Sequence, residues 1–145
     1  MSLLLSMNKD KKVIWKDQVD SSQAQRIQLI DKTIQYFEEY ELQLKIDRYE
    51  FFLVLDEAIS NAMEHGNQWN RSKKVLLEVH TPENNSVCIA ITDAGSGFDP
   101  MQYVSPTSYS PNMALRGRGI IIMKTFCTVT WNDKGNTIYL CIKLK

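Results

Sequence analysis

Two polar residues one helical turn apart, Glu57 and Asn61, are the first residues of this sequence that could do chemistry. They lie in DEAISNAMEHGNQW, residues 56–69, and on a helix their spacing of four puts both side chains on one face. An asparagine oxygen can ligate Mg²⁺, and a nearby carboxylate can accept the proton of an attacking hydroxyl. For an isolated pair, a solvated helix face is the more frequent interpretation.

An acid followed by glycines forms the second cluster, in ITDAGSGFD, residues 91–99. Side chains two positions apart in a strand point to the same face, and Asp93 continues the apolar series of the strand-like run before it, which has the same parity. We therefore expect its carboxylate to point toward the helix layer. A buried acid needs a donor, for example the amino group of a purine. Gly95 and Gly97 would let the backbone approach a ligand, although D-x-G-x-G is also a common turn.

The third cluster is RGRGIII, residues 116–122, in which we expect the glycines to open a helix. Free N–H groups at a helix start, with glycines that allow close approach, suit a phosphate. Arg116 and Arg118 could add charge-assisted contacts. The alternative is a loop whose glycines, Gly117 and Gly119, only allow a sharp entry into the helix.

In this order the three clusters resemble the ATP-binding boxes of the GHKL superfamily, whose fold is shared with histidine kinases. EAISNAMEHGN is similar to the N-box of one branch, the anti-sigma factor serine/threonine kinases, and the resemblance covers roughly residues 12–144. It implies ATP and Mg²⁺ as cofactors, with Glu57 as general base, Asn61 as magnesium ligand and Asp93 as the acid that recognises the adenine amino group.

The resemblance also implies a lid over the nucleotide, formed by residues 100–116, and a structural role for His65 at the end of its helix. The other residues that it places around ATP are Gly95, Gly97, Arg116, Gly117, Arg118 and Gly119.

The function that the resemblance implies is a protein kinase that phosphorylates a Ser or Thr of a STAS-type anti-sigma antagonist and sequesters a sigma factor, with a homodimer as its assembly. The alternative is a catalytically weak ATP-binding switch module that sequesters a protein partner without phosphoryl transfer. Glu57 favours the kinase, because nucleotide binding alone needs no base. The ATPase half of a histidine kinase is disfavoured, because no helix with a phospho-acceptor histidine precedes the domain.

The elements that must position these residues follow from hydrophobic patterning. We predict a strand at 12–19, a helix from 22 to 40, a second helix from 48 to 68, and an antiparallel hairpin of 73–80 with 86–93. The residues expected on the buried faces of the two helices are Ile27, Ile30, Ile34 and Phe37, then Phe52, Leu55, Ile59, Ala62 and Met63.

The second half of the chain is predicted as a long loop over 94–117, a helix over 119–126 and a closing hairpin of 127–133 with 136–144. Together the elements predict an α/β fold. We expect a two-layer α/β sandwich of the histidine-kinase ATPase type, in which a mixed, mostly antiparallel sheet is covered on one face by helices.

Composition limits the remaining choices. A length of 145 residues fits a single domain, 1–145, with a flexible start at 1–11. The 17 basic residues balance the 17 acidic ones, so we expect no overall electrostatic attraction to nucleic acid or to a membrane surface. The start of the chain is too short for a secretory or membrane segment, so we expect a cytoplasmic protein. We predict buried reduced thiols for Cys88, Cys127 and Cys141, rather than a zinc site or a disulfide.

Overall fold

The structure is a computed structural model that describes residues 12–97 and 111–145, without the side chains of 111–117. Residues 1–11, predicted to be flexible, and 98–110, most of the predicted lid, lie outside the described residues. The elements in chain order are β1 (Val13–Asp20), α2 (Gln23–Glu39), α3 (Arg48–Asn61), the π-helical turn η1 (Ala62–Gly66), β2 (Lys74–His80), β3 (Ser86–Thr92), α4 (Pro111–Phe126), β4 (Thr128–Trp131) and β5 (Thr137–Lys143).

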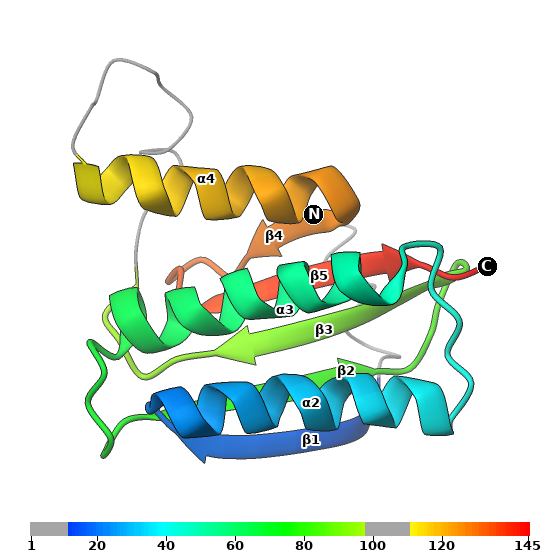
Figure 1. The fold of residues 1–145 in the computed structure, drawn as a ribbon, viewed down its shortest axis with the longest axis horizontal. Helices are drawn as coiled ribbons and strands as arrows, with labels where there is room; N and C mark the ends of the chain where they lie inside the picture. Colours follow the sequence, from blue (N-terminus) through cyan, green and yellow to red (C-terminus); the bar gives the residue numbers. More distant parts are fainter. Residues whose placement is uncertain (1–11, 98–110) are drawn as a thin grey trace.

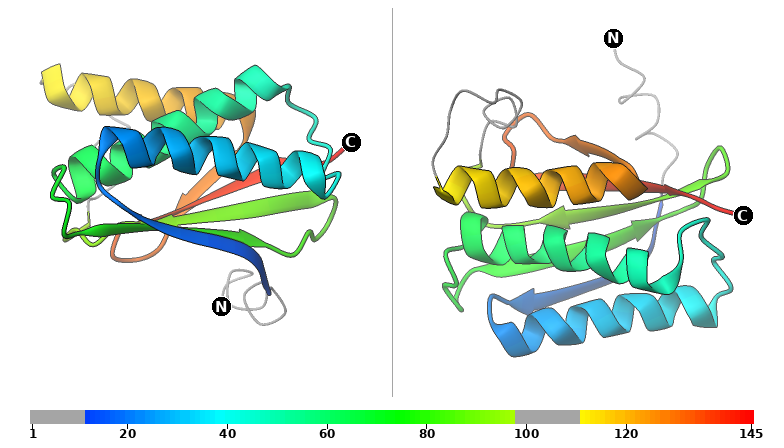
Figure 2. Two further views of the ribbon diagram at one scale, coloured as in Figure 1. Left: turned by 60° about the horizontal axis from the view of Figure 1, so that its bottom comes forward. Right: turned by 45° about the horizontal axis from the view of Figure 1, so that its top comes forward.

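The five strands form one sheet in the order β1-β2-β3-β5-β4, and each of these neighbouring pairs is antiparallel. Helices α2, α3 and α4 lie side by side on one face of that sheet (Figures 1 and 2). The predicted two-layer α/β fold and both predicted hairpins are therefore confirmed.

Helix α2 begins where the sequence offers a cap. The Ser22 hydroxyl accepts a hydrogen bond from the Gln25 N–H at 3.3 Å, which satisfies one of the unpaired donors at the helix start. Ile30, Ile34 and Phe37 are buried as predicted. Ile27 is 52% exposed, so its predicted burial is wrong.

Helix α3 starts with a capping box, in which Asp47 accepts from the Glu50 N–H and the Glu50 carboxylate accepts from the Asp47 N–H. Its buried face includes Phe51, whereas the predicted Phe52 is 38% exposed. The prediction of one α-helix to residue 68 is also wrong, because α3 ends at Asn61 and continues as η1. Such π turns are rare and occur mostly as single turns, often at functional sites.

Both faces of β3 are buried, because Cys88 and Ala90 are buried as well as their neighbours, but only the residues with the predicted parity belong to the core cluster. Val87, Ile89 and Ile91 are almost fully buried in the core cluster, beneath the helices. Leu77 of β2 and Leu140 of β5 belong to the same cluster. Asp93 follows this row directly at the end of β3.

Helix α4 differs most from the sequence-based expectation. It begins at Pro111, so the predicted loop over 94–117 is wrong at its end and the helix is longer than the predicted 119–126. A proline is well suited to a first helical turn, because its missing N–H would be unpaired there. Packing of α4 along α3 outweighs the low helix propensity of Gly117 and Gly119.

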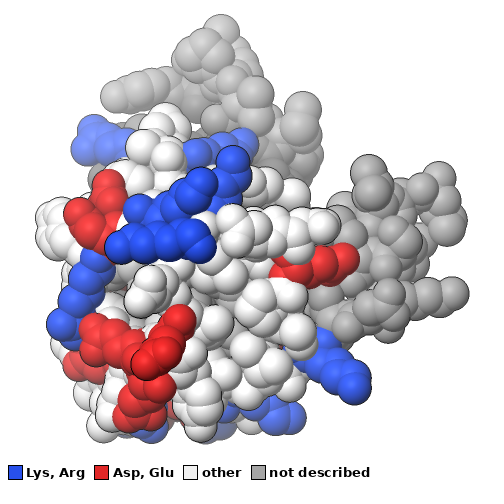
Figure 3. All heavy atoms as spheres, turned by 90° about the vertical axis from the view of Figure 1, so that its right-hand side faces the viewer, with Lys and Arg blue, Asp and Glu red and all other residues white. Residues whose placement is uncertain are grey.

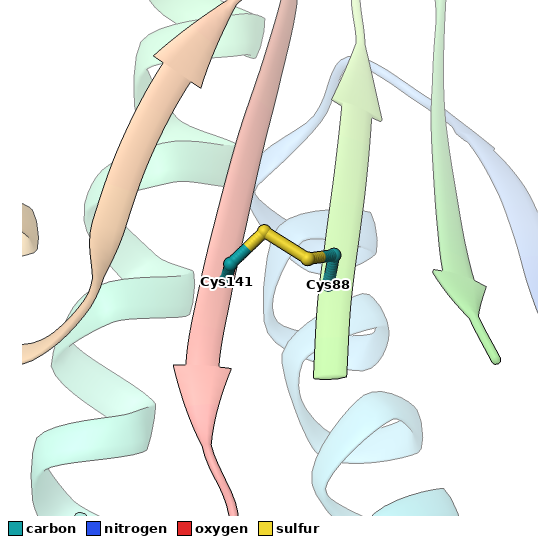
Figure 4. The surroundings of a disulfide bond; sticks show 2 residues. All are labelled: Cys88 and Cys141. Atoms are coloured by element: carbon teal, nitrogen blue, oxygen red, sulfur yellow. A yellow bond between two sulfur atoms is a disulfide. The ribbon is translucent and has the colours of Figure 1, made fainter. Parts of the chain in front are cut away.

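The prediction of three reduced thiols is wrong for two of the cysteines. Cys88 of β3 and Cys141 of β5 face each other in the antiparallel register, with Cα atoms 4.1 Å apart, and form a disulfide (Figure 4). Cys127 is a free thiol, and burial raises its pKa to about 12.

Charges of both signs are interspersed on the face shown in Figure 3, so no single-sign field dominates that face. Within the described part of the chain, no helix combines the length and the apolar character needed to cross a membrane.

Candidate functional site

Glu57 and Asn61 lie on a part of α3 against which α4 packs. A Cβ built on Gly119 of α4 would lie 2.6 Å from Glu57 Oε2 and 3.5 Å from Asn61 Nδ2. The two polar side chains therefore share a face, as their spacing predicts, and Gly119 borders both.

A cavity of about 370 Å³ opens beside these residues, between α3, η1 and α4. Glu57, Asn61, Arg118 and Gly119 contribute to its lining. Arg118 is exposed and brings a positive charge to a cavity whose lining also contains carboxylates. Such a cavity can accept an anionic group through the arginine and a cation through the oxygen ligands.

A second, smaller cavity connects Asn61 with Asp93. It has a volume of about 20 Å³ and is closed by Ile120 and Met123 of α4 and by Trp131 of β4. That volume holds about one water molecule, which is much less than a purine occupies. Asn61 lines both cavities.

The electrostatics of the larger cavity favour proton transfer. Burial raises the pKa of the Glu57 carboxyl above its ordinary value of 4.5, and the neighbouring Asp56 carboxylate raises it further. A carboxylate with a raised pKa holds a proton more strongly, which makes it a better general base.

The backbone of Asp93 is held from the side of the β4–β5 turn. Its N–H donates to the Asn136 carbonyl at 2.9 Å, and its carbonyl accepts from Asn136 Nδ2 at 3.2 Å. Its carboxylate Oδ1 accepts from the Gly95 N–H at 2.7 Å. These hydrogen bonds hold the backbone of Asp93 directly after β3, together with one of its carboxylate oxygens.

The glycines around Asp93 are explained by close packing within the chain. A Cβ on Gly66 would lie 2.6 Å from Asp93 Oδ1, and a Cβ on Gly95 would lie 2.9 Å from the same atom. Gly97 has a φ of +91°, and a Cβ there would collide with the Lys134 carbonyl. Side chains at these positions would push the Asp93 loop away from η1 and from the β4–β5 turn.

The expected helix start at the third cluster is wrong. Gly117 and Gly119 lie inside α4, where backbone N–H groups are engaged by carbonyls one turn earlier and cannot receive a phosphate. The side chain of Arg116 lies outside the described residues. Arg118 and Gly119 remain at the site through their place in the larger cavity.

Histidine and cysteine do not build a metal centre in the described part of the chain, where no group of three or more His, Cys, Asp or Glu side chains could hold a metal ion. His65 lies in η1, with Nε2 3.8 Å from a Glu64 carboxylate oxygen, at the end of the helical segment where we predict a structural role.

Two residues near the site were missed by sequence reasoning. Asn136 holds the backbone of Asp93, and Asn67 is fully buried and accepts a hydrogen bond from the Ala94 N–H at 2.8 Å. The only signal in the sequence is position, since Asn67 directly follows the His65–Gly66 pair and Asn136 directly precedes the last strand.

Comparison with known proteins gives consistent results. A family model described as a histidine kinase-like ATPase domain matches residues 19–142. An anti-sigma F factor of Clostridium perfringens is 28% identical over 96 residues, which cover 62% of this chain and 68% of the relative. An anti-sigma F factor of Priestia megaterium is 30% identical over 93 residues, which cover 60% of this chain and 63% of the relative. The structure resembles that of the mycobacterial sensor histidine kinase MprB, with a TM-score of 0.54 at 14% identity, over 90% of this chain and 99% of the other.

Proposed function

The chain belongs to the histidine kinase-like ATPase domain family, and on that premise we propose that it is an ATP-dependent serine/threonine protein kinase that acts as an anti-sigma factor in a partner-switching system. The family supports ATP binding. The relatives named anti-sigma F factor support the regulatory role.

The observation that carries the proposal is the position of Asn61, which lines both cavities of the site. On one side are Glu57 and Arg118, which suit a transferable phosphate and its acceptor. On the other side is Asp93, which suits a purine amino group. The order base, phosphate, metal ligand, nucleobase is the order that a bound nucleotide would need.

Asp93 is proposed to accept a hydrogen bond from the exocyclic amino group of adenine. Guanine carries a carbonyl at the corresponding ring position and would meet the carboxylate with an acceptor, so the acid selects ATP over GTP. The pair of Asn136 hydrogen bonds to the Asp93 backbone keeps the acid oriented.

The oxygen donors at the site fit Mg²⁺. This hard cation usually takes only one or two protein ligands and completes its shell with water and phosphate oxygens. The Asn61 carboxamide, which lines both cavities, suits that role, and Mg²⁺ bound there would supply charge stabilisation to the phosphates.

Glu57 is proposed as the general base. It would accept the proton of the attacking Ser or Thr hydroxyl while the hydroxyl oxygen bonds to the γ-phosphorus and the bond to the β–γ bridging oxygen breaks, so that ADP leaves. Its raised pKa helps it to take that proton. Arg118 is proposed to neutralise charge on the phosphates.

The relatives named anti-sigma F factor support a sigma factor as a partner. We propose a sigma factor as the sequestered protein, a STAS-type antagonist as the phosphorylated one, a homodimer as the assembly and the cytoplasm as the location.

A second candidate is an ATP-gated binding module without phosphoryl transfer. The observation in its favour is that Gly117 and Gly119 lie inside α4, so no helix start is available for the phosphates while α4 keeps this position. A protein that binds ATP and its protein partner but never transfers phosphate would be such a binding module.

The test is to measure ATP binding by calorimetry with and without Mg²⁺, and phosphate transfer to the antagonist by mass spectrometry. We expect ATP binding that depends on Mg²⁺ and a single phosphorylated residue on the antagonist. Asn61→Ala should weaken the Mg²⁺-dependent part of ATP binding and abolish transfer. No ATP binding by the wild type at millimolar nucleotide would refute the proposal, and binding without transfer would favour the binding module.

A further inference from the structure

Asn67 is a completely buried amide at the junction of three segments of the chain. Its Nδ2 donates to Ser21 Oγ at 2.9 Å, ahead of α2, and to the Lys74 carbonyl at 3.0 Å, at the start of β2. The Lys73 carbonyl is a weaker third acceptor at 3.3 Å. On its other side, Oδ1 accepts from the Ala94 N–H at 2.8 Å, in the loop that follows β3.

The orientation of this amide is fixed by its neighbours. A carboxamide has two donor hydrogens on nitrogen and acceptor sites only on oxygen. Rotating the Asn67 group by half a turn would place its oxygen against the Lys73 and Lys74 carbonyls and its nitrogen against the Ala94 N–H, which loses every one of these bonds. Oδ1 therefore always faces the loop that carries Asp93.

The π turn explains how Asn67 reaches this loop. The Asn67 N–H donates to the Ala62 carbonyl at 2.9 Å and the Trp69 N–H to the Met63 carbonyl at 2.8 Å, both wider spacings than those of an α-helix. The widened turn places Gly66 against the Asp93 carboxylate and directs Asn67 inward. A regular α-helical turn would rotate Asn67 to another face.

The bond to Ala94 fixes the peptide group directly after Asp93. Asn136 also holds the backbone of Asp93, since its carbonyl accepts from the Asp93 N–H and its Nδ2 donates to the Asp93 carbonyl. Asp93 is thus clamped between Asn136 and Asn67, and both must stay in place for its carboxylate to keep one direction.

We infer that Asn67 is a positioning residue for nucleobase recognition, which acts by holding the Ala94 peptide and through it the direction of the Asp93 carboxylate. This inference rests on the proposed function, because it requires Asp93 to contact adenine. It assigns Asn67 a role in specificity for ATP over GTP, in addition to its contribution to stability.

The experiment compares Asn67→Ala with Ser21→Ala, the matched control. Ser21→Ala removes one acceptor of Asn67 and the hydroxyl bond to the Lys73 carbonyl, but it leaves the bond to Ala94 intact. Dissociation constants for ATP and GTP are measured by calorimetry at a temperature where both variants are folded by circular dichroism. Both variants should melt at lower temperature than the wild type.

We expect Asn67→Ala to weaken ATP binding by about two- to tenfold, the range set by one net hydrogen bond, and to reduce the ATP-to-GTP preference by a similar factor. Ser21→Ala should keep the wild-type preference. Asn67→Asp, which retains an acceptor for the Ala94 N–H, should lose stability but keep the preference. An unchanged preference in Asn67→Ala, or an equal loss in Ser21→Ala, overturns the inference.

Hydrogen exchange of the wild type provides a measurement that does not depend on how well a variant folds. The Ala94 amide should be protected without nucleotide, and fast exchange there would overturn the inference. These outcomes are distinct from failure of the proposed function, in which the wild type itself does not bind ATP.

Discussion

Gly119→Ala tests whether the contact between α4 and Glu57 controls phosphate transfer. The new Cβ would lie 2.6 Å from Glu57 Oε2, so the carboxylate must withdraw by about 0.8 Å to reach an ordinary contact distance of 3.4 Å. A misplacement of about 1 Å can cost about 10²-fold in rate, because the reacting atoms lose their alignment. We therefore expect the transfer rate to fall by about 10²-fold.

The free energy of unfolding of the same variant should stay nearly unchanged or increase slightly. Alanine is favoured over glycine inside a helix by roughly 0.5–1 kcal/mol, and the atom that must move is the end of a flexible side chain. The free energy of unfolding at pH 7 should thus stay within about 1 kcal/mol of the wild type or increase slightly. ATP affinity should be nearly unchanged, since Asp93 is not touched.

The assay measures the initial rate of antagonist phosphorylation, ATP affinity by calorimetry and unfolding in urea. The control is a double-mutant cycle with Glu57→Gln, because Gly119→Ala should add no further loss once the base is gone. A full transfer rate in Gly119→Ala would refute the reasoning. So would a loss of the same size in the Glu57→Gln background, since the effect would then not pass through Glu57.

Three further predictions follow from the described contacts. Burial and then Asp56 raise the pKa of the Glu57 carboxyl, so this group contributes stability that is present below about pH 4.5 and is lost as pH rises through the folded pKa. Glu57→Gln should therefore be more stable than the wild type in urea at pH 7, a difference that closes below pH 4.5; the same difference at both pH values would contradict the burial of this group. Asp93→Asn should weaken binding of ATP more than of GTP in calorimetry, and equal losses would argue against contact with adenine. The Cys88–Cys141 disulfide joins residues 53 positions apart, so in the chain-entropy model its reduction should lower the free energy of unfolding by up to about 4 kcal/mol. Identical denaturation curves with and without reductant would show that the disulfide does not form in solution.

Several features were predictable because they depend on neighbours in the sequence. The cap at Ser22 acts within a few residues, and the shared parity of Val87, Ile89 and Ile91 places these side chains on one face of β3 without knowledge of the partner strands. The stacking of Glu57 and Asn61 follows from helix geometry alone. The family resemblance rests on the same local patterns, and the match over residues 19–142 confirms it.

The extent of α4 was mispredicted because two influences oppose each other there. The glycines at 117 and 119 disfavour a helix by about 1 kcal/mol each, which is all that the local sequence reveals. Packing of the segment from Pro111 to Phe126 along α3 outweighs that cost, and it also brings Gly119 against Glu57. No pattern within the segment itself predicts that contact.

The sequence by itself determined the strand and helix order, the face that carries Glu57 and Asn61, and the family, because each of these is encoded at short range. The tertiary structure alone decided the pairing of Cys88 with Cys141, which depends on the register of strands far apart in the chain. It also decided the bond from Asn67 to the Ala94 peptide, across 27 residues. Contacts of this kind join segments far apart in the sequence, so their partners cannot be predicted from local periodicity.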